Sequence, residues 1–161
     1  MRYQPVIHKI VSLEEFIDTI RKWKDTGEKV VFSNGCFDIL HRGHTDYLEK
    51  ARMLGDKLVI GLNTDRSVHE IKGGNRPIQD EQSRLQIMAS LSFIDLITLF
   101  DESTPKSLIK MSKPDILVKG DDYEVENIVG AEFVIRNGGK VETIPLVKGY
   151  STTSLINKIR K

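Results

Sequence analysis

Five short apolar runs alternate with helix-like stretches along most of this chain of 161 residues. The runs are apolar throughout rather than at every second residue, which is typical of strands buried on both faces. Strands that alternate with helices favour a parallel sheet covered by helices on both faces. The predicted strands are residues 29–33, 58–62, 95–100, 116–119 and 140–145, and the helices between them are 43–54, 80–92, 104–111 and 124–137.

A further helix precedes the first predicted strand. Ser12 opens a capping-box pattern, and Phe16 and Ile20 recur on one helical face after it. We predict one domain over residues 1–161, with 1–27 as an N-terminal helical segment packed on it. The reason is that a chain of this length forms one substantial core but is too short for two.

Charge and composition argue against several partners. The 24 Lys and Arg residues nearly balance the 23 Asp and Glu residues, so no nucleic-acid surface is expected. No apolar run approaches the length of a membrane span, and the N-terminus lacks the apolar core of a signal peptide. The single cysteine, Cys36, rules out an internal disulfide and fits a reducing compartment. We therefore expect a cytoplasmic protein that binds neither nucleic acid nor membrane.

Two histidines, His41 and His44, lie at the predicted turn from the first strand into a helix. The second falls in the first turn of that helix, where unpaired backbone N–H groups and the helix dipole favour anions. Gly43, between them, lets the backbone approach a phosphate closely. The pair is therefore predicted to donate hydrogen bonds to a phosphoryl group as charge develops in a transition state.

The pair also permits two other interpretations. A zinc site needs four ligands when it is structural and three when it is catalytic. The chain offers only His8 and His69 as further imidazoles and Cys36 as a thiol. Alternatively, His44 only caps or packs. The strand-to-helix setting favours the phosphate role.

Polar segments follow the later strands too, at the edge where open parallel sheets bind ligands. A serine-threonine run at 151–153 precedes a predicted last helix, 153–160. Ser151 or Thr152 is expected to cap that helix. The neighbouring hydroxyls and the helix N–H groups would then be placed to bind phosphate.

Basic residues follow the second predicted strand. Lys72 and Arg76 lie in a predicted polar loop that carries two glycines. They are either ordinary surface charges or part of a mobile cationic loop that closes over a phosphorylated substrate. Arg84, on the next helix, is either a bidentate phosphate clamp or the partner of Asp80 on its own helix.

Carboxylates near the same edge have two interpretations. Asp121 and Asp122, after Gly120, either cap the next helix or reach a Mg²⁺–nucleotide complex, a ribose or a base. Asp38 is expected to hold its loop rather than attack a substrate. Cys36 is expected to be structural, because nothing near it in the sequence forms a thiolate-activating set.

Taken together, these motifs resemble those of the HxGH nucleotidyltransferase superfamily. Residues 41–44 are His-Arg-Gly-His, and the cytidylyltransferase-like branch pairs this motif with a C-terminal Ser-Thr-Thr, here 151–153. Segments 72–78 (KGGNRPI) and 118–123 (VKGDDY) are similar to adenylyltransferases that act on heptose 1-phosphate. The resemblance covers nearly the whole chain.

This resemblance implies an α/β fold with a Rossmann-like, doubly wound, parallel five-stranded sheet. It also implies transfer of AMP from ATP to D-glycero-β-D-manno-heptose 1-phosphate. The products would be pyrophosphate and ADP-heptose, a precursor of lipopolysaccharide or surface glycans. Mg²⁺ would be bound mainly through the nucleotide phosphates rather than by protein metal ligands, and the protein would be a homodimer. Because a phosphate monoester is already an anionic nucleophile, catalysis would depend on positioning and charge stabilisation.

The patterns and the resemblance together select the candidate site residues. The catalytic candidates are His41, His44 and Lys72. The nucleotide-binding candidates are Cys36, Phe37, His41, Gly43, His44, Arg84, Gly120, Asp121, Lys148, Gly149, Ser151, Thr152 and Thr153. The substrate-binding candidates are Asp38, Asn63, Lys72 and Arg76. Lys148 stands where related cytidylyltransferases often carry an arginine, so the charge is kept but the bidentate fork is lost.

Three alternative functions are considered. A cytidylyltransferase acting on glycerol 3-phosphate or another phospho-alcohol shares both motifs. A GDP-heptose-forming enzyme shares the sugar class. A non-catalytic nucleotide-binding module is disfavoured, because both motif histidines are present. Some relatives of the heptose branch carry a sugar kinase domain in the same chain, for which 161 residues leave no room.

Overall fold

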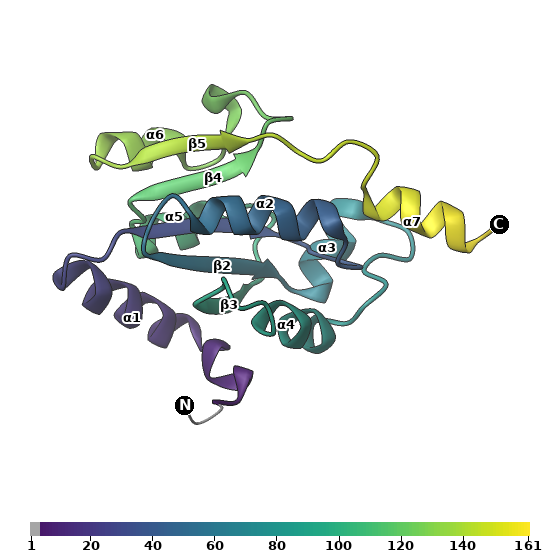
Figure 1. Cartoon of the computed structure of the whole chain (residues 1–161), viewed down its shortest axis with the longest axis horizontal. Coiled ribbons are helices and arrows are strands. Elements are labelled where there is room, and N and C mark those ends of the chain that lie inside the picture. The colour runs from purple at the N-terminus through teal and green to yellow at the C-terminus, as the bar shows by residue number, and fades with distance from the viewer. Residues whose placement is uncertain (1–3) are drawn as a thin grey trace.

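The sheet contains five parallel strands, as the sequence predicts (Figure 1). The computed structural model describes residues 4–161, so the first three residues of the predicted segment 1–27 lie outside the described residues. The strands are β1 (Val30–Gly35), β2 (Lys57–Asn63), β3 (Leu96–Phe100), β4 (Ile116–Gly120) and β5 (Lys140–Ile144). Their order is β3-β2-β1-β4-β5 with parallel pairing throughout, so the sheet is doubly wound around β1.

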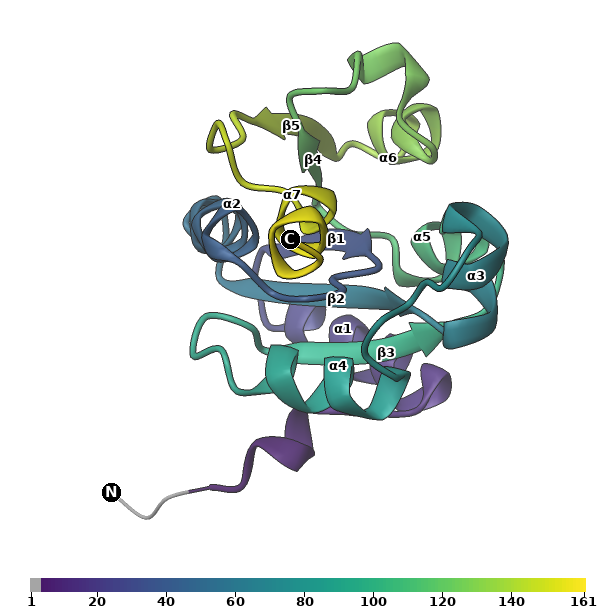
Figure 2. The same ribbon diagram turned by 90° about the vertical axis from the view of Figure 1, so that its right-hand side faces the viewer.

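Helices cover both faces of the sheet, which confirms the predicted layers (Figure 2). The helices within the described residues are η1 (Val6–Lys9), α1 (Leu13–Asp25), α2 (Arg42–Arg52), α3 (Asp65–Lys72), α4 (Glu81–Ala89), α5 (Lys106–Ser112), η2 (Val125–Asn127), α6 (Ala131–Arg136) and α7 (Thr152–Ile159). α2 and α4 pack on one face, whereas α1, α5 and α6 pack on the other. None of these helices combines the length and the apolar character needed to cross a bilayer.

Helix α1 forms where the capping pattern predicts it. Ser12 Oγ accepts a hydrogen bond from Glu15 N at 3.2 Å, and Ser12 N donates to Glu15 Oε2 at 3.2 Å. Phe16 and Ile20 are buried in the same core cluster as Val30 of β1. Burying these two side chains stabilises the fold by roughly 3–6 kcal/mol, so segment 13–25 is held against the sheet.

Residues 65–72 correct one prediction, because they form helix α3 rather than a polar loop. Thr64 caps the helix by accepting a hydrogen bond from Ser67 N at 3.2 Å. Val68 is the only apolar residue of α3 that is buried, so the segment carries no apolar period for the sequence to reveal. Lys72 is consequently the last residue of a helix. Gly73, with φ of 64°, then turns the chain away.

The predicted helix 124–137 is also wrong in part, because the structure divides it. The turn η2 is followed by Gly130, which has φ of 89°, and only then by α6. A Cβ atom at Gly130 would lie 2.7 Å from Ile109 Cδ1 on α5. The glycine therefore allows both the left-handed backbone and the close packing of α6 on α5.

Strands β1 and β4 separate toward their carboxyl ends. β1 pairs with β2 from Val30↔Lys57 to Gly35↔Leu62, but with β4 only at Val31↔Ile116 and Phe32↔Leu117. This gap lies where the strand order reverses, the place at which open α/β sheets bind ligands.

Candidate active site

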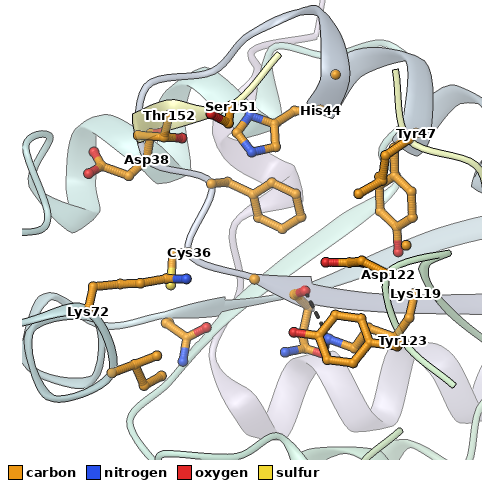
Figure 3. A pocket seen from close by; sticks show the side chains of 18 of the residues that line it. Cys36, Asp38, His44, Tyr47, Lys72, Lys119, Asp122, Tyr123, Ser151 and Thr152 are labelled. Atoms are coloured by element: carbon orange, nitrogen blue, oxygen red, sulfur yellow. Dashed lines mark hydrogen bonds between the residues drawn. The ribbon is translucent and has the colours of Figure 1, made fainter. Parts of the chain in front are cut away.

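A cavity of about 590 Å³ opens at the carboxyl ends of the strands (Figure 3). Its walls come from the β1–α2 turn, the end of α3, the end of β4 and the start of α7. This volume lies within the range typical of small-molecule sites. The sequence-predicted residues that line it are Cys36, Phe37, Asp38, His41, Gly43, His44, Asn63, Lys72, Arg76, Gly120, Ser151, Thr152 and Thr153.

The two motif histidines cap helix α2 reciprocally. His41 is the N-cap residue, and its Nδ1 accepts a hydrogen bond from Gly43 N at 3.1 Å. His44 Nδ1 accepts from His41 N at 3.4 Å, and the two rings stack with centroids 3.8 Å apart. A Cβ atom at Gly43 would lie 2.9 Å from His41 Cε1. Gly43 is thus required for the His41 ring to fold back over the helix terminus.

The capping bonds fix which ring nitrogen carries a proton. Because each Nδ1 accepts a backbone N–H, a neutral ring must hold its proton on Nε2. Burial lowers the pKa of His41, and burial together with the neighbouring His41 ring lowers the pKa of His44 to about 4. At neutral pH both rings are therefore uncharged, and each offers one Nε2–H donor.

The turn that leads into the histidines is strained. Phe37 and Ile39 have positive φ angles of 45° and 53°, which are costly for residues with a Cβ atom and most so for a β-branched one. Ile39 N donates to Gln79 Oε1 at 3.0 Å, and Cys36 O accepts from Arg84 Nη1 at 2.7 Å. Strain of this kind persists only where surrounding contacts impose it, and it is frequent at functional sites.

Asp38 makes several of the side-chain hydrogen bonds that hold this turn in place. Its carboxylate accepts hydrogen bonds from Ile78 N at 2.8 Å, Gln79 N at 2.9 Å and Arg76 Nε at 2.7 Å, and its side chain is 0% exposed. Burial raises the pKa of Asp38, but these three hydrogen bonds outweigh it and hold the pKa below its usual value. The carboxylate of Asp38 is thus already engaged within the protein, and its contact with a substrate stays a prediction. Its expected loop-holding role fits this geometry.

The prediction for Arg84 is corrected. We predicted a nucleotide-binding phosphate clamp or a partner for Asp80, but the side chain is 0% exposed and does not line the cavity. Its guanidinium donates to Cys36 O, to Gln79 O and to Asp65 Oδ1. Arg84 thus joins α4, α3 and the β1–α2 turn, and it does not border the cavity.

Lys72 and Arg76 differ in how they meet the cavity. Lys72 is exposed, and its side chain extends from the end of α3 toward Cys36 (Figure 3). Arg76 is bound to Asp38, so part of its charge is neutralised before any ligand arrives. Burial raises the pKa of the Cys36 thiol, with Lys72 acting in the opposite direction. Cys36 is therefore held as a neutral thiol near the cavity.

The run at 151–153 caps α7, as the sequence predicts, and it lies on the cavity wall. Ser151 is the N-cap of α7, because its Oγ accepts from Ser154 N at 3.1 Å. Thr152 Oγ1 donates to Asp38 O at 2.8 Å and so connects α7 to the strained turn. Thr153 borders the cavity beside them. The start of α7 therefore faces the same space as the histidines.

Besides Arg84, three predicted nucleotide-binding residues lie outside the cavity lining: Asp121, Lys148 and Gly149. Asp121 Oδ1 accepts a hydrogen bond from Leu146 N at 3.1 Å, so its carboxylate connects the segments that follow β4 and β5. Gly149 has φ of 83° and forms a turn ahead of α7. Asp122 borders the cavity in place of Asp121.

Asn63, predicted to bind substrate, borders the cavity but is only 3% exposed. Its Nδ2 donates to Ser67 Oγ at 2.9 Å, so the amide holds the start of α3.

The sequence reasoning missed Lys119 and Asn34, which face each other in the gap between β4 and β1. Lys119 Nζ donates to Asn34 Oδ1 at 2.6 Å, and both residues line the cavity. Burial lowers the pKa of Lys119 to about 8. A lysine at the end of an otherwise apolar strand could have been recognised as a candidate site residue. Its partner Asn34 could not, because the contact depends on the order of the strands in the sheet.

Within residues 4–161, no group of three or more His, Cys, Asp and Glu side chains is arranged to hold a metal ion. Asp122 is the exposed carboxylate on the cavity wall, whereas that of Asp38 is buried and bonded. A divalent cation at this site would thus need ligands that the substrates supply.

Known proteins match both the sequence and the structure. Residues 32–158 match the family model described as cytidylyltransferase-like. The chain is 48% identical over 150 residues to the bifunctional protein HldE of Koribacter versatilis, a match that spans 93% of this chain and 31% of that protein. It is 52% identical over 151 residues to the bifunctional protein HldE of Citrifermentans bemidjiense, spanning 94% of this chain and 31% of that protein. The chain therefore spans about a third of the length of these curated relatives.

A solved structure agrees with this assignment. The crystal structure of the lipopolysaccharide core biosynthesis protein from Thermoplasma volcanium superposes with a TM-score of 0.61 at 34% sequence identity, and covers 78% of this chain and 100% of that chain. The doubly wound sheet and the histidine-capped helix define a nucleotidyltransferase. More specifically, the chain belongs to the cytidylyltransferase-like family.

Proposed function

We propose that this protein transfers AMP from ATP to D-glycero-β-D-manno-heptose 1-phosphate, forming ADP-heptose and pyrophosphate. The observation that carries the proposal is the pair of neutral, stacked histidines at the amino end of α2, on the wall of a cavity large enough for a nucleotide. The similarity of segments 72–78 and 118–123 to heptose 1-phosphate adenylyltransferases supports the choice of sugar. The name of the Thermoplasma volcanium relative, a lipopolysaccharide core biosynthesis protein, agrees with it.

In this reaction a phosphate oxygen of the sugar 1-phosphate attacks the α-phosphorus of ATP. The bond from that phosphorus to the bridging oxygen breaks, and pyrophosphate leaves with the electron pair. His41 and His44 would donate their Nε2–H bonds to the phosphoryl oxygens as charge develops. The exposed ammonium of Lys72 and the start of α7, including Ser151 and Thr153, would hold the remaining phosphate charge.

Mg²⁺ forms part of the proposal. When bound, it would neutralise phosphate charge through the phosphate oxygens. Asp122 is the protein carboxylate best placed to approach it from the cavity wall. The resemblance to this branch also supports a homodimer, and the single cysteine supports a cytoplasmic location.

The first experiment measures pyrophosphate release with Mg²⁺. ATP, CTP and GTP are each combined with the heptose 1-phosphate and with glycerol 3-phosphate. Release with ATP and the heptose alone is expected. The family description favours one alternative, a cytidylyltransferase that acts on glycerol 3-phosphate. Release with CTP and glycerol 3-phosphate alone would replace the proposal with that alternative. Release with GTP and a heptose phosphate would change only the base.

A variant then tests the histidine donors. His44→Ala should lower kcat roughly 10²- to 10³-fold, the typical cost of removing such a donor. His69→Ala, an exposed histidine on α3, is the matched control and should match the unsubstituted protein. An unchanged rate in His44→Ala would place the reaction elsewhere.

A further inference from the structure

Side chains, rather than backbone pairing, connect β1 to β4 in the gap at the cavity floor. Regular pairing ends at Phe32↔Leu117. Beyond it, Tyr47 of α2 bridges the two strands: its Oη lies 2.8 Å from Ser33 Oγ on β1 and donates to Val118 O on β4 at 2.9 Å. Lys119 Nζ donates to Asn34 Oδ1 at 2.6 Å (Figure 3, dashed line). The gap is thus spanned by two separate side-chain contacts, one made by a neutral hydroxyl and the other by an ammonium group.

The Lys119 ammonium has no carboxylate partner within ion-pair distance among residues 4–161. The groups that face it are Asn34, the Cys36 thiol, the more distant Asp122 carboxylate and the Tyr123 ring, whose centroid is 5.9 Å from Nζ. Holding a partly buried cation without a counter-ion costs stability, so such an arrangement is expected where a ligand benefits from it.

The contact also orients the Asn34 amide. Because Oδ1 accepts from Lys119, both Nδ2–H bonds remain for other acceptors, and Asn34 lines the cavity. Lys119 directs two of its three N–H bonds at Asn34, one to Oδ1 and one to the backbone oxygen. The third remains for a ligand. The pair therefore presents a cluster of N–H donors to the cavity.

This cluster lies apart from the phosphate end of the cavity. His44, Ser151 and Thr152 gather on one side, whereas Lys119 and Tyr123 lie together on another (Figure 3). Tyr123 is 50% exposed and contributes an aromatic face beside the donors. An aromatic face next to hydrogen-bond donors suits the C–H face and the hydroxyl oxygens of a sugar ring.

We propose that Lys119 and Asn34 form a specificity site that binds the hydroxyl groups of a sugar ring, either the ribose of the nucleotide or the acceptor sugar. This inference rests on the proposed function for the identity of the two sugars, but not for the existence of the donor pair. Lys119 has two tasks here: it orients Asn34, and it donates to the sugar itself.

The test compares Lys119→Met and Asn34→Asp with the unsubstituted protein in pyrophosphate-release kinetics. Lys119→Met keeps the apolar stem and removes the donors, so KM for one substrate should rise roughly 10- to 100-fold, the usual range for a hydrogen bond to a charged group. Lys57→Met is the matched control, because Lys57 begins β2 at the opposite edge of the sheet. It should leave both KM values unchanged.

Asn34→Asp separates binding from a purely structural role. An aspartate still accepts from Lys119, and more strongly, but it replaces the Nδ2–H donors with an acceptor. We expect an unfolding midpoint at least as high as that of the unsubstituted protein, together with a raised KM. If Asn34 only anchored Lys119, this variant would retain its KM.

The affected substrate identifies the sugar. A raised KM for ATP, with lost discrimination against 2′-deoxy-ATP or 3′-deoxy-ATP, assigns the pair to the ribose. A raised KM for the heptose 1-phosphate alone assigns it to the acceptor. In either case kcat/KM of the unsubstituted protein should fall above about pH 8, as Lys119 loses its proton, and Lys119→Met should lack that fall.

Calorimetric titration with ATP and with the heptose 1-phosphate keeps this inference separable from the proposed function. If the protein releases no pyrophosphate but binds one of them, and Lys119→Met weakens that binding, the inference stands while the proposed function fails. If both variants lower only the unfolding midpoint and leave KM, affinity and pH profile unchanged, Lys119 merely joins two strands and the inference is overturned. If the protein binds neither ATP nor the heptose 1-phosphate, the inference is overturned as well.

Discussion

The β1–α2 turn and the start of α7 border the same cavity, but they are held very differently. The turn is fixed by the buried Asp38 carboxylate and by the fully buried Arg84 guanidinium. Helix α7 has no buried residue, and Thr152 Oγ1 connects it to the turn through Asp38 O. Figure 1 shows α7 extending beyond the carboxyl ends of the strands, away from both helical layers.

This difference suggests a division of work between the two regions. The turn places the histidine donors before any ligand arrives, which is what charge stabilisation requires. The α7 segment contributes hydroxyls and helix N–H groups from an element with few packing contacts, so its local stability should be well below that of the core. We expect phosphates that bind across both regions to stabilise α7 further.

The largest effect is expected from Asp38→Asn, which weakens the rigid region. An amide keeps the shape, but it removes the charge that faces Arg76 and sets an N–H₂ group against backbone N–H donors. Breaking one partner of a buried ion pair costs about 3–5 kcal/mol, so urea unfolding should show a loss of that size. Activity should fall as well, because Phe37 and Ile39 lose the contacts that impose their strain.

Asp46→Asn is the control for this variant. Asp46 also forms an ion pair at 2.7 Å, with Lys50, but at the exposed surface of α2. Its replacement should cost less than about 0.5 kcal/mol. Equal losses in the free energy of unfolding would mean that the contacts of Asp38 hold the turn no more strongly than an exposed ion pair would. The contrast between the turn and α7 would then disappear.

A second test uses the pH dependence of stability. His44 has a folded-state pKa of about 4, against about 6.5 in the unfolded chain. As pH falls below 6.5, the unfolded chain takes up a proton that the folded ring refuses, so the free energy of unfolding decreases until about pH 4. The full effect is about 3 kcal/mol. Urea unfolding at pH 7, 5.5 and 4.5 measures most of it, and the carboxylates that begin to titrate near pH 4.5 do so in the comparison variant as well.

His44→Asn supplies the comparison in the same experiment. The Asn side chain still offers an oxygen to His41 N but does not titrate, so the dependence between pH 6.5 and 4.5 should be clearly shallower. A variant curve parallel to that of the unsubstituted protein would show that the His44 ring is not held neutral by the fold. The turn would then be less rigid than its contacts indicate.

The sequence predicted the frame of the molecule because that frame depends on local patterns. Unbroken apolar runs predicted the parallel strands, and the strand and helix patterns on either side of His41 and His44 predicted their place at a helix terminus. Both predictions need only neighbours in the chain. Helix α3 was missed because Val68 is its only buried apolar residue. The predicted helix over 124–137 was too long because Gly130, which interrupts it, is required by a close contact with Ile109 on another helix.

For Arg84 and Asp38, the sequence could not reveal the partners within the protein that the structure gives them. Arg84 and Asp38 carry charges that suit phosphate or substrate, and composition alone gives no reason to bury them. The structure uses both to hold the turn, and the partners they meet come from three separate segments. Lys119 was missed for the converse reason: its partner Asn34 is 85 residues away and becomes a neighbour only because β4 lies beside β1.

The smallest effect is expected from Thr152→Val, which tests the loosely held region. The variant keeps the side-chain shape and removes one hydrogen bond to Asp38 O, worth about 1 kcal/mol. Since α7 contributes no buried residue, we expect little change in the unfolding midpoint. Hydrogen exchange of the α7 amides should instead accelerate, and KM for ATP should rise about fivefold, the equivalent of that lost bond.

Thr26→Val is the matched control, because Thr26 Oγ1 makes a similar bond to Trp23 O at 2.9 Å, at the end of α1. It should leave α7 exchange and KM unchanged. If Thr152→Val also leaves both unchanged, α7 is held by contacts other than this one, and the two sides of the cavity are equally preorganised.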